Sequence, residues 1–565
     1  MTPDPAFDAI RLQVVWSRLI SVADEIATTL ERTAFSLIVR DNQDYACALY
    51  DARGVMLAQS SQCTPGQAGS TPTVIGEMLA TYPADTLEDG DILICNDPWV
   101  GAGHAPDVFV ATPLFRLGRL VGFACTCAHH ADMGGRLGAT DAREVYEEGV
   151  IIPVSKLWRA GVRNDELYRL LARNVRMSEK VLGDISAQIA ANRVGGKGIV
   201  ALMDDFGLDS LEPLATQIAD TTEAMFRRAL SQLPRGQARS EVFHEITDAD
   251  GQRLKIAVTL TVTDGEVHLD FAGTSAQVEQ PINAVLNITR AYAIFPFIAT
   301  LCPELPMNAG AFRPVVLDVP EGTVLNPTFP APGMYRSLLS YFTVEALMGA
   351  IYQIAPDLAM APSGTYPLWT EKFAGIGPDG RRFLSHYNAQ GGQGAFRDRD
   401  GNSAVVFPGN IATTSVELFE LEAPFLFLSR ELRPDSGGPG RFRGGLGQET
   451  VMRCLSDTPV QVAFSGGRLV EPAQGRENAQ PGAAGVIQVR DDATFVRSGR
   501  EVMLKGDLCR FSQPGGGGFG DPALRDPGLI ARDLRLGYVT RESAMRDYGV
   551  DVAPDGTVSR RIAAE

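Results

Sequence analysis

The spacing of the apolar residues changes at residues 234–236, and this change constrains the fold more than any other feature of the sequence. Residues 164–234 carry apolar residues at helical spacing, which predicts a largely helical region. From residue 237 the pattern alternates and turns at Asp250-Gly251 and Asp264-Gly265, which predicts an antiparallel meander. The sequence therefore indicates a mixed α+β fold with a boundary close to residue 235.

A chain of 565 residues is too long for a single core and predicts two or three domains. Residues 1–235 are expected to form an α/β and helical region that bears the candidate metal ligands. Residues 236–522 are expected to be rich in β-strands, glycine and proline, with helices at 283–300 and 338–355, and to pack with the first region as one functional unit. Residues 523–565 are expected to form a helical tail.

The first region contains several patterns that predict its elements. Residues 8–34 predict a helix with one buried face, and the following residues predict a hairpin that turns at residues 51–54. Residues 64–73 are rich in Gly, Ser, Thr and Pro, which predicts a loop before a short helix. Gly195-Gly196 predicts a break in the long helical pattern. Strands are expected at 91–95, 108–113 and 119–128.

The charge balance and the cysteine content exclude some classes of protein. A net charge of −17 argues against a nucleic-acid binder, which would normally present a basic face. No apolar run reaches about 18 residues, so we expect no membrane span. The N-terminus does not resemble a secretory signal. The eight cysteines are scattered and are expected to be reduced thiols, so we expect a cytoplasmic protein.

Three of the six histidines fall between Cys95 and Gly135, close to several carboxylates. His104 and Asp107 stand three residues apart at a predicted turn, and His129 lies near the end of a later strand. Imidazole and carboxylate donors in this arrangement are typical of a hydrolytic metal site with open coordination positions.

Ordinary hydrogen bonds that cap a loop are the alternative explanation for this cluster. Since neighbouring residues of a strand point to opposite faces, only one of His129 and His130 can point inward. Asp132 or Asp97 could then orient a ligating imidazole.

Two other motifs favour structural explanations. Residues 514–520, PGGGGFG, lack the Lys-Ser/Thr of a phosphate-binding loop, so a turn that needs positive φ is favoured over close ligand approach. Cys125-x-Cys127 has no second cysteine pair at the spacing of a zinc ribbon, which favours buried thiols. We find no nucleotide-binding fingerprint in the sequence.

Several motifs together resemble one known family. They are NDPWVGAGHAPD (96–107), AHHADMGG (128–135), EEGVIIPVSKL (147–157) and PGGGGFGDPALRDP (514–527). They resemble the B subunit of ATP-dependent hydantoinases, in the hydantoinase B/oxoprolinase family, which is related to caprolactamase and to subunits of acetone and acetophenone carboxylases. The resemblance runs in order from about residue 8 to 550.

The resemblance implies an enzyme subunit that hydrolyses a cyclic amide. A separate A-type subunit would bind ATP and phosphorylate the carbonyl or amide oxygen of the substrate, in a hetero-oligomer such as α2β2. One divalent metal, Zn, Mn or Fe, would be held in this chain. The family pattern assigns it to His104, Asp107 and His129, with Asp44 completing the site. His130 or Asp132 would transfer the proton.

The sequence departs from the family pattern around these residues. The usual GGTHLPD is GAGHAPD (101–107), a common histidine is Gln67, and Cys127 replaces a basic residue that often precedes the tandem histidines. Because of these changes, the sequence does not identify the substrate. The alternatives are a subunit of an ATP-dependent ketone carboxylase, in which an enol phosphate meets carboxyphosphate or CO₂, and a structural partner that has lost the chemistry.

Overall fold

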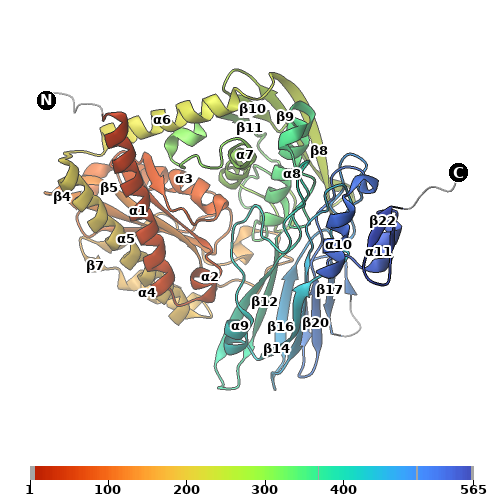
Figure 1. The fold of residues 1–565 in the computed structure, drawn as a ribbon. Helices are drawn as coiled ribbons and strands as arrows, with labels where there is room; N and C mark the ends of the chain where they lie inside the picture. The colour runs from red at the N-terminus through yellow and green to blue at the C-terminus, as the bar shows by residue number, and fades with distance from the viewer. Residues whose placement is uncertain (1–6, 367, 491–493, 561–565) are drawn as a thin grey trace. The chain divides into compact units, whose positions relative to one another are not determined.

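The computed structural model describes residues 7–366, 368–490 and 494–560 (Figure 1). The chain divides into two compact units. The first unit comprises Met1–Gln237, Val258–Arg336 and Gly409–Thr414. The second comprises Ala238–Ala257, Ser337–Pro408 and Ser415–Glu565. Each unit therefore takes segments from distant parts of the chain, and the linear division at residues 235 and 522 stays a prediction. The predicted mixed α+β class is confirmed.

A seven-stranded sheet forms the centre of the first unit, in the order β2-β1-β5-β4-β3-β6-β7. Its neighbouring strands are antiparallel. The strands are β1 (Tyr45–Asp51), β2 (Met56–Gln59), β3 (Ile92–Cys95), β4 (Asp107–Arg116), β5 (Arg119–His129), β6 (Ser155–Arg159) and β7 (Val162–Arg163). The hairpin and the three strands that the sequence predicted here are confirmed.

Seven helices belong to the described part of the first unit. They are α1 (Ala9–Thr33), α2 (Leu37–Arg40), α3 (Pro65–Thr81), α4 (Asp165–Asn174), α5 (Ser178–Phe206), α6 (Glu212–Leu230) and α7 (Leu286–Leu301). Helix α1 lies against β1 and β2, and α5 lies against β4 and β5. Asp8 caps α1, since its carboxylate accepts a hydrogen bond from the amide of Arg11.

The two faces of the central sheet meet different helices. Tyr45, Cys47 and Leu49 of β1 pack into the core that α1 and α5 share. Residues between them point the opposite way, and there the hydroxyl of Tyr50 donates to Thr71 of α3 at 2.6 Å. The face toward α3 is also the face on which the candidate site lies.

The predicted break at Gly195-Gly196 is wrong, because α5 runs through both residues. A Cβ on Gly195 would lie 2.3 Å from Cδ1 of Ile26 in α1, and one on Gly196 would lie 2.7 Å from Cδ2 of Leu114 in β4. The glycines therefore let α5 approach α1 and the sheet closely, and this packing outweighs their low helix propensity.

The predicted loop at 64–73 is also wrong, since α3 begins at Pro65 and continues through Pro72. A Cβ on Gly69 would lie 2.5 Å from Cβ of Ala291 in α7. Small residues thus allow two helices to pack at short distance, and Pro65 suits the first helical position because it has no amide to leave unsatisfied. Gln67 therefore lies in the first turn of a helix.

A four-stranded sheet follows the helical region, in the order β11-β10-β9-β8. Its strands are β8 (Gly236–Thr247), β9 (Arg253–Val262), β10 (Val267–Asp270) and β11 (Val315–Asp318). β9 and β10 are antiparallel, while β10 and β11 are parallel. The predicted meander is confirmed at both of its turns, where Gly251 and Gly265 adopt positive φ.

Two sheets share an apolar core in the second unit. One has the order β13-β12-β16-β19 and the other β14-β15-β20-β17-β18. The strands are β12 (Trp369–Ile376), β13 (Arg382–Ala389), β14 (Phe425–Leu432), β15 (Gln448–Cys454), β16 (Val460–Ser465), β17 (Val486–Val489), β18 (Thr494–Phe495), β19 (Gly499–Met503) and β20 (Leu508–Ser512). Helices α8 (Ser337–Ile354) and α9 (Val416–Glu422) belong to the same unit.

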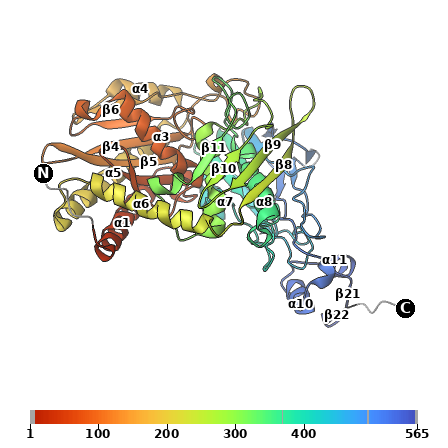
Figure 2. The ribbon, with the colours of Figure 1, turned by 90° about the horizontal axis from the view of Figure 1, so that it is seen from above.

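The end of the chain forms two short helices and a β-hairpin with a small core of their own. They are α10 (Pro527–Arg535), α11 (Arg541–Asp547), β21 (Val550–Val552) and β22 (Val558–Arg560), seen together in Figure 2. Among the described residues, no helix is long and apolar enough to cross a membrane.

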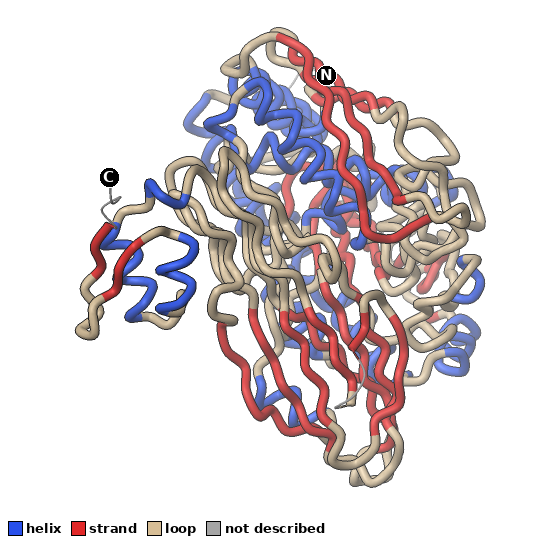
Figure 3. Tube along the Cα trace, turned by 90° about the vertical axis from the view of Figure 1, so that its right-hand side faces the viewer, coloured by secondary structure: helices blue, strands red, loops and turns tan. Residues whose placement is uncertain are grey.

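Extended glycine-rich segments lie side by side in the second unit and appear as neighbouring loop traces in Figure 3. The amides of Gly515, Gly516, Gly517 and Gly518 each donate to a backbone carbonyl outside their own segment, at Ala483, Gly445, Pro362 and Gln480. A Cβ on Gly516 would lie 2.0 Å from the carbonyl oxygen of Gln393. The favoured explanation of residues 514–520 as a turn with positive φ holds only at Gly520; the four preceding glycines are needed for backbone contact.

Candidate metal centre

Asp107 and His129 are cross-strand neighbours on the central sheet. Asp107 is the first residue of β4, His129 is the last of β5, and the two are paired in the register. Residues directly opposite each other in a sheet point to the same face, so both side chains lie on the side of α3. The backbone amide of His129 donates to the carbonyl of Asp44 at 3.0 Å, which brings the segment before β1 to the same place.

His104 adds a buried imidazole to this pair. Its Nδ1 lies 3.1 Å from the carbonyl oxygen of Met334, and its ring centroid lies 5.1 Å from that of His129. Since a carbonyl can only accept, Nδ1 carries the proton and Nε2 presents a lone pair. Burial, followed by the charge of Arg336, lowers the pKa of His104, so the ring is neutral at neutral pH.

His104 Nε2 and Asp107 Oδ2 lie 3.0 Å apart without forming a hydrogen bond. With Nδ1 protonated, both atoms carry lone pairs, and a bound cation would convert this repulsive contact into a favourable one. The carbonyl that holds the opposite nitrogen is the partner that a metal-ligating histidine normally has.

Gln67 joins the two carboxylates of the site. Its Nε2 donates to Asp44 Oδ1 at 2.9 Å and to Asp107 Oδ1 at 2.8 Å. Burial, with the charge of Asp107, raises the pKa of Asp44. Burial alone would also raise the pKa of Asp107, but the pKa is lowered, and the charge of Arg336 contributes to this lowering. The pair therefore shares its negative charge unequally, with Asp107 ionised.

Arg336 places a guanidinium beside the same carboxylate. Its Nη2 donates to Asp107 Oδ2 at 2.7 Å. Gly103 makes this approach possible, because a Cβ at that position would lie 2.6 Å from Cδ of Arg336. Where the family pattern has threonine, this chain has the one residue type that leaves space for the arginine.

His130 and Asp132 contact other parts of the first unit. His130 Nε2 lies 3.0 Å from Oε1 of Gln188 in α5, on the face of the sheet opposite to His129. Asp132 forms an ion pair with Arg176 at 2.7 Å and accepts from the amide of Gly134. Their predicted proton-transfer roles stay predictions.

The site thus brings together His104, Asp107, His129 and Asp44, the four predicted ligands. It also includes two residues that the sequence did not single out for it. Gln67 had a signal, because it stands where the family pattern has a histidine. Arg336 lies more than two hundred residues from Asp107, and nothing in its local sequence indicates a functional position.

The donor set fits a divalent metal, with two imidazoles and two carboxylates. In the described part of the chain, no group of three or more His, Cys, Asp or Glu side chains already has a ligating arrangement. The amide of Gln67 bridges the two carboxylates instead, and the guanidinium of Arg336 binds Asp107. Binding of a metal would therefore require the carboxylate side chains to reorient.

Comparison with known proteins assigns the chain to a family. A family model described as Hydantoinase B/oxoprolinase matches residues 8–522, which is most of the chain. The chain belongs to the hydantoinase B/oxoprolinase family. A protein of Pseudomonas sp. (strain NS671), provisionally named as the B component of a D-/L-hydantoinase, is 32% identical over 577 residues, covering 96% of this chain and 95% of that protein.

Two solved structures share the fold. The ATP-dependent caprolactamase from Pseudomonas jessenii aligns with a TM-score of 0.89 at 26% identity, covering 97% of each chain. A nucleotide-free acetone carboxylase aligns with a TM-score of 0.88 at 21% identity, covering 98% of this chain and 81% of that one. At the latter identity the likeness concerns the fold alone.

Proposed function

We propose that this chain is the metal-dependent B subunit of an ATP-dependent cyclic amide hydrolase. The observation that carries the proposal is the 3.0 Å contact between His104 Nε2 and Asp107 Oδ2, two lone-pair atoms held in place by the surrounding structure. The similarity to a D-/L-hydantoinase component and to an ATP-dependent caprolactamase supports the reaction class.

The reaction needs activation because resonance protects an amide carbonyl and an amine is a poor leaving group. Phosphorylation of the carbonyl oxygen by an A-type partner subunit would supply a better leaving group. A divalent metal, Zn, Mn or Fe, would supply Lewis-acid activation of water in this chain. We propose His104, Asp107, His129 and Asp44 as its ligands.

The chain's own residues prepare these ligands. Met334 fixes the tautomer of His104, so that Nε2 is available as a donor. Arg336 and Gln67 hold the carboxylate of Asp107 from two sides. Asp44 would lose its proton when the metal binds, since a ligating carboxylate must be ionised.

ATP would bind to the partner and not to this chain. The sequence contains no nucleotide-binding fingerprint, and the amides of Gly515–Gly518 are already bonded to carbonyls, so they are not available to a phosphate group. Two relatives, the hydantoinase component and the β-chain of a caprolactamase, are each one subunit of a larger enzyme, which supports a hetero-oligomer. We propose an α2β2 arrangement. A cytoplasmic location is part of the proposal, supported by eight cysteines that are all free thiols.

The test begins with copurification of the chain and its A-type partner. ATP hydrolysis is then measured with hydantoins, lactams, 5-oxoproline and aryl ketones, and metal content is measured by mass spectrometry. We expect cyclic amides to stimulate ATP turnover. A dependence on bicarbonate, with aryl ketones as the active substrates, would favour the ketone carboxylase instead.

His104→Ala tests the metal centre, and His268→Ala is its matched control. His268 is an exposed histidine on β10. We expect His104→Ala to lose stoichiometric metal and to lower turnover by about 100-fold or more, while His268→Ala keeps both. Full metal content and full activity in His104→Ala would contradict the proposal and favour a structural partner.

A further inference from the structure

A cavity of about 430 Å³ lies in the second unit, and none of its lining residues belongs to the candidate metal centre. It is formed by β8, α8 and the loop that precedes β17. Residues of these segments line it: Arg239, Ser240, Glu241, Val242, Glu345, Gly349, Tyr352, Gln353, Pro362, Gln474, Gly475 and Arg476. Its size falls within the range of small-molecule sites.

Arg476 contributes an unusual guanidinium to this cavity. Its Nε donates to the carbonyl oxygen of Met360 at 3.1 Å, and its guanidinium lies 4.6 Å from the ring centroid of Tyr352. Among the described residues, its two terminal amino groups have no hydrogen-bond partner, and no carboxylate lies within ion-pair distance of it. Burial lowers the pKa of Arg476, which is the electrostatic sign of a charge that is incompletely compensated.

The carboxylates that line the cavity form ion pairs with cations other than Arg476. Glu345 forms an ion pair with Arg468. Glu241 forms ion pairs with Arg239 at 3.0 Å and with Lys255 at 3.4 Å. The cavity therefore keeps one positive charge that no residue of its lining neutralises by direct contact.

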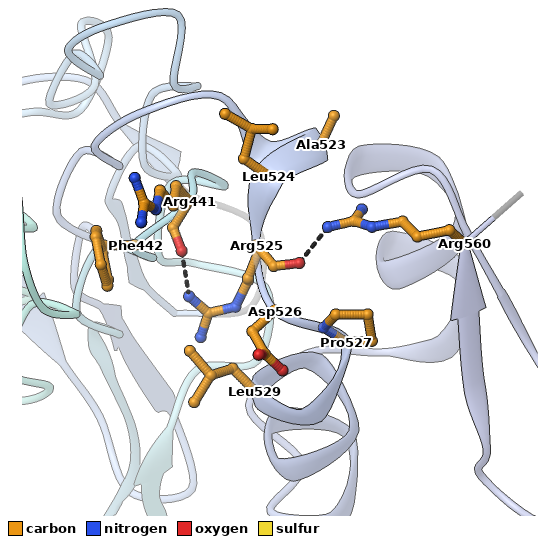
Figure 4. A pocket seen from close by; sticks show the side chains of 9 residues that line it. All are labelled: Arg441, Phe442, Ala523, Leu524, Arg525, Asp526, Pro527, Leu529 and Arg560. Carbon is orange, nitrogen blue, oxygen red and sulfur yellow. Dashed lines mark hydrogen bonds between the residues drawn. The ribbon is translucent and has the colours of Figure 1, made fainter.

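A second cavity in the same unit, of about 530 Å³, provides a contrast (Figure 4). Its buried arginine, Arg525, donates to Asp400 and Asp533 at 2.7 Å each, and to the carbonyl of Arg441 at 3.2 Å. The charge of Arg525 is thus fully compensated by protein groups. An anion has less to gain there than at Arg476.

We propose that the cavity around Arg476 binds the carboxylate of a small organic acid. The terminal amino groups of a guanidinium form a planar fork that matches both oxygens of a carboxylate. Tyr352 supports the guanidinium from one side, while Val242 and Pro362 offer apolar contact for the body of the ligand. This inference does not depend on the metal centre or on the proposed reaction.

The test uses 4-fluorobenzoate as the probe, with ¹⁹F NMR and calorimetry on the full chain. 4-Fluorobenzamide has the same shape without the charge, and phenylphosphonate is a different anion. We expect the carboxylate to bind once per chain and the amide not to bind. Arg476→Met is expected to weaken binding by about 10- to 100-fold, and Arg476→Lys, which keeps the charge but loses the fork, by a smaller factor.

Arg441→Met is the matched control, because Arg441 is an exposed arginine that lines the other cavity. It should bind the probe as the wild type does. A second measurement needs no variant: phenylglyoxal modifies accessible arginines, and peptide mass spectrometry reports each site. Benzoate is expected to protect Arg476 and to leave modification of Arg441 unchanged.

Several results would overturn the proposal. They are equal binding of 4-fluorobenzoate and 4-fluorobenzamide, tighter binding of phenylphosphonate, unchanged binding of 4-fluorobenzoate in Arg476→Met, and the absence of protection at Arg476 by benzoate. A dissociation constant of the wild-type chain for 4-fluorobenzoate weaker than about 10 mM would also overturn it. If Arg476→Met does not fold, the wild-type protection experiment and Arg476→Lys decide.

Discussion

Glu371 is a residue whose environment conflicts with its charge. It lies on β12 two residues from both Trp369 and Phe373, so strand alternation places its side chain on their face, in the apolar core, where it is fully buried. Neither carboxyl oxygen has a hydrogen-bond partner in another described residue. Burial raises the pKa of Glu371 well above its usual range, so the folded protein holds this side chain protonated.

Glu371→Gln is expected to stabilise the protein in a pH-dependent way. Because the folded pKa lies above the unfolded one, the contribution of Glu371 to stability is most favourable below about pH 4.5 and is lost as the pH rises toward the folded pKa. The variant escapes this loss, so we expect it to be more stable by about 1–3 kcal/mol at pH 8 and nearly equal at pH 4.5. Denaturant unfolding at both pH values is the measurement.

Glu431→Gln serves as the control for Glu371→Gln. Glu431 is an exposed acid on β14, and its replacement should leave the pH dependence unchanged. A lower stability of Glu371→Gln than of the wild type at pH 8 would show that the raised pKa of Glu371 does not destabilise the folded protein.

At the scale of single residues, the sequence predicted the metal centre in part. The spacing of His104, Asp107 and His129 follows from a turn and a strand pair, both of which leave local signals. Asp44 came from family resemblance. Arg336 reaches the site through tertiary packing against Gly103, and no local pattern records such a contact.

Among the elements, α5 shows how packing decides the role of a glycine. Gly195 lies against Ile26 of α1, whereas Gly76, an exposed residue of α3, has open space around it. Glycine at position 195 therefore allows two helices to pack closely, whereas glycine at position 76 only lowers the helix propensity of α3.

Gly195→Ala and Gly76→Ala are expected to have opposite effects. The first adds a methyl group 2.3 Å from Cδ1 of Ile26, and overpacking should destabilise the protein by about 1–3 kcal/mol. The second should stabilise it by about 0.5–1 kcal/mol, because alanine loses less backbone entropy in a helix. Thermal unfolding of both variants is the measurement, and a loss of stability of equal size in both would contradict this account.

The helices and strands with clear periodicity were predicted well, and the errors share a cause. α1, α7 and α8 have apolar faces that the sequence shows directly. At residues 64–73 and at Gly195-Gly196, glycine and proline predicted irregular structure. In both places the deciding contact is made by a distant helix, such as Ala291 against Gly69, so local propensity was outweighed.

At the scale of the whole molecule, the chain supplies one half of the proposed reaction. Its two units interleave segments from distant parts of the sequence, an arrangement that periodicity cannot predict. Neither unit shows a phosphate-binding loop in its described residues. The glycine run that most resembles one has its amides occupied.

The purified chain alone is expected to show no ATP hydrolysis with hydantoins, lactams, 5-oxoproline or aryl ketones. Addition of the A-type partner should restore turnover, and a partner preparation without this chain should consume ATP without releasing the ring-opened product. Phosphate release and product analysis are the measurements. Steady ATP turnover by this chain alone would contradict the division of labour.

The hydrogen bonds of the glycine-rich segments in the second unit also affect how fast their amide hydrogens exchange with solvent. Amide hydrogens in connecting segments usually exchange quickly with solvent, since few of them are hydrogen-bonded. Gly515–Gly518 are outside helices and strands, yet each donates to a backbone carbonyl in one of three neighbouring segments. We expect their amides to exchange with deuterium as slowly as those of β20, because the glycine run is bonded to three neighbouring segments and leaves them only when all of these hydrogen bonds open.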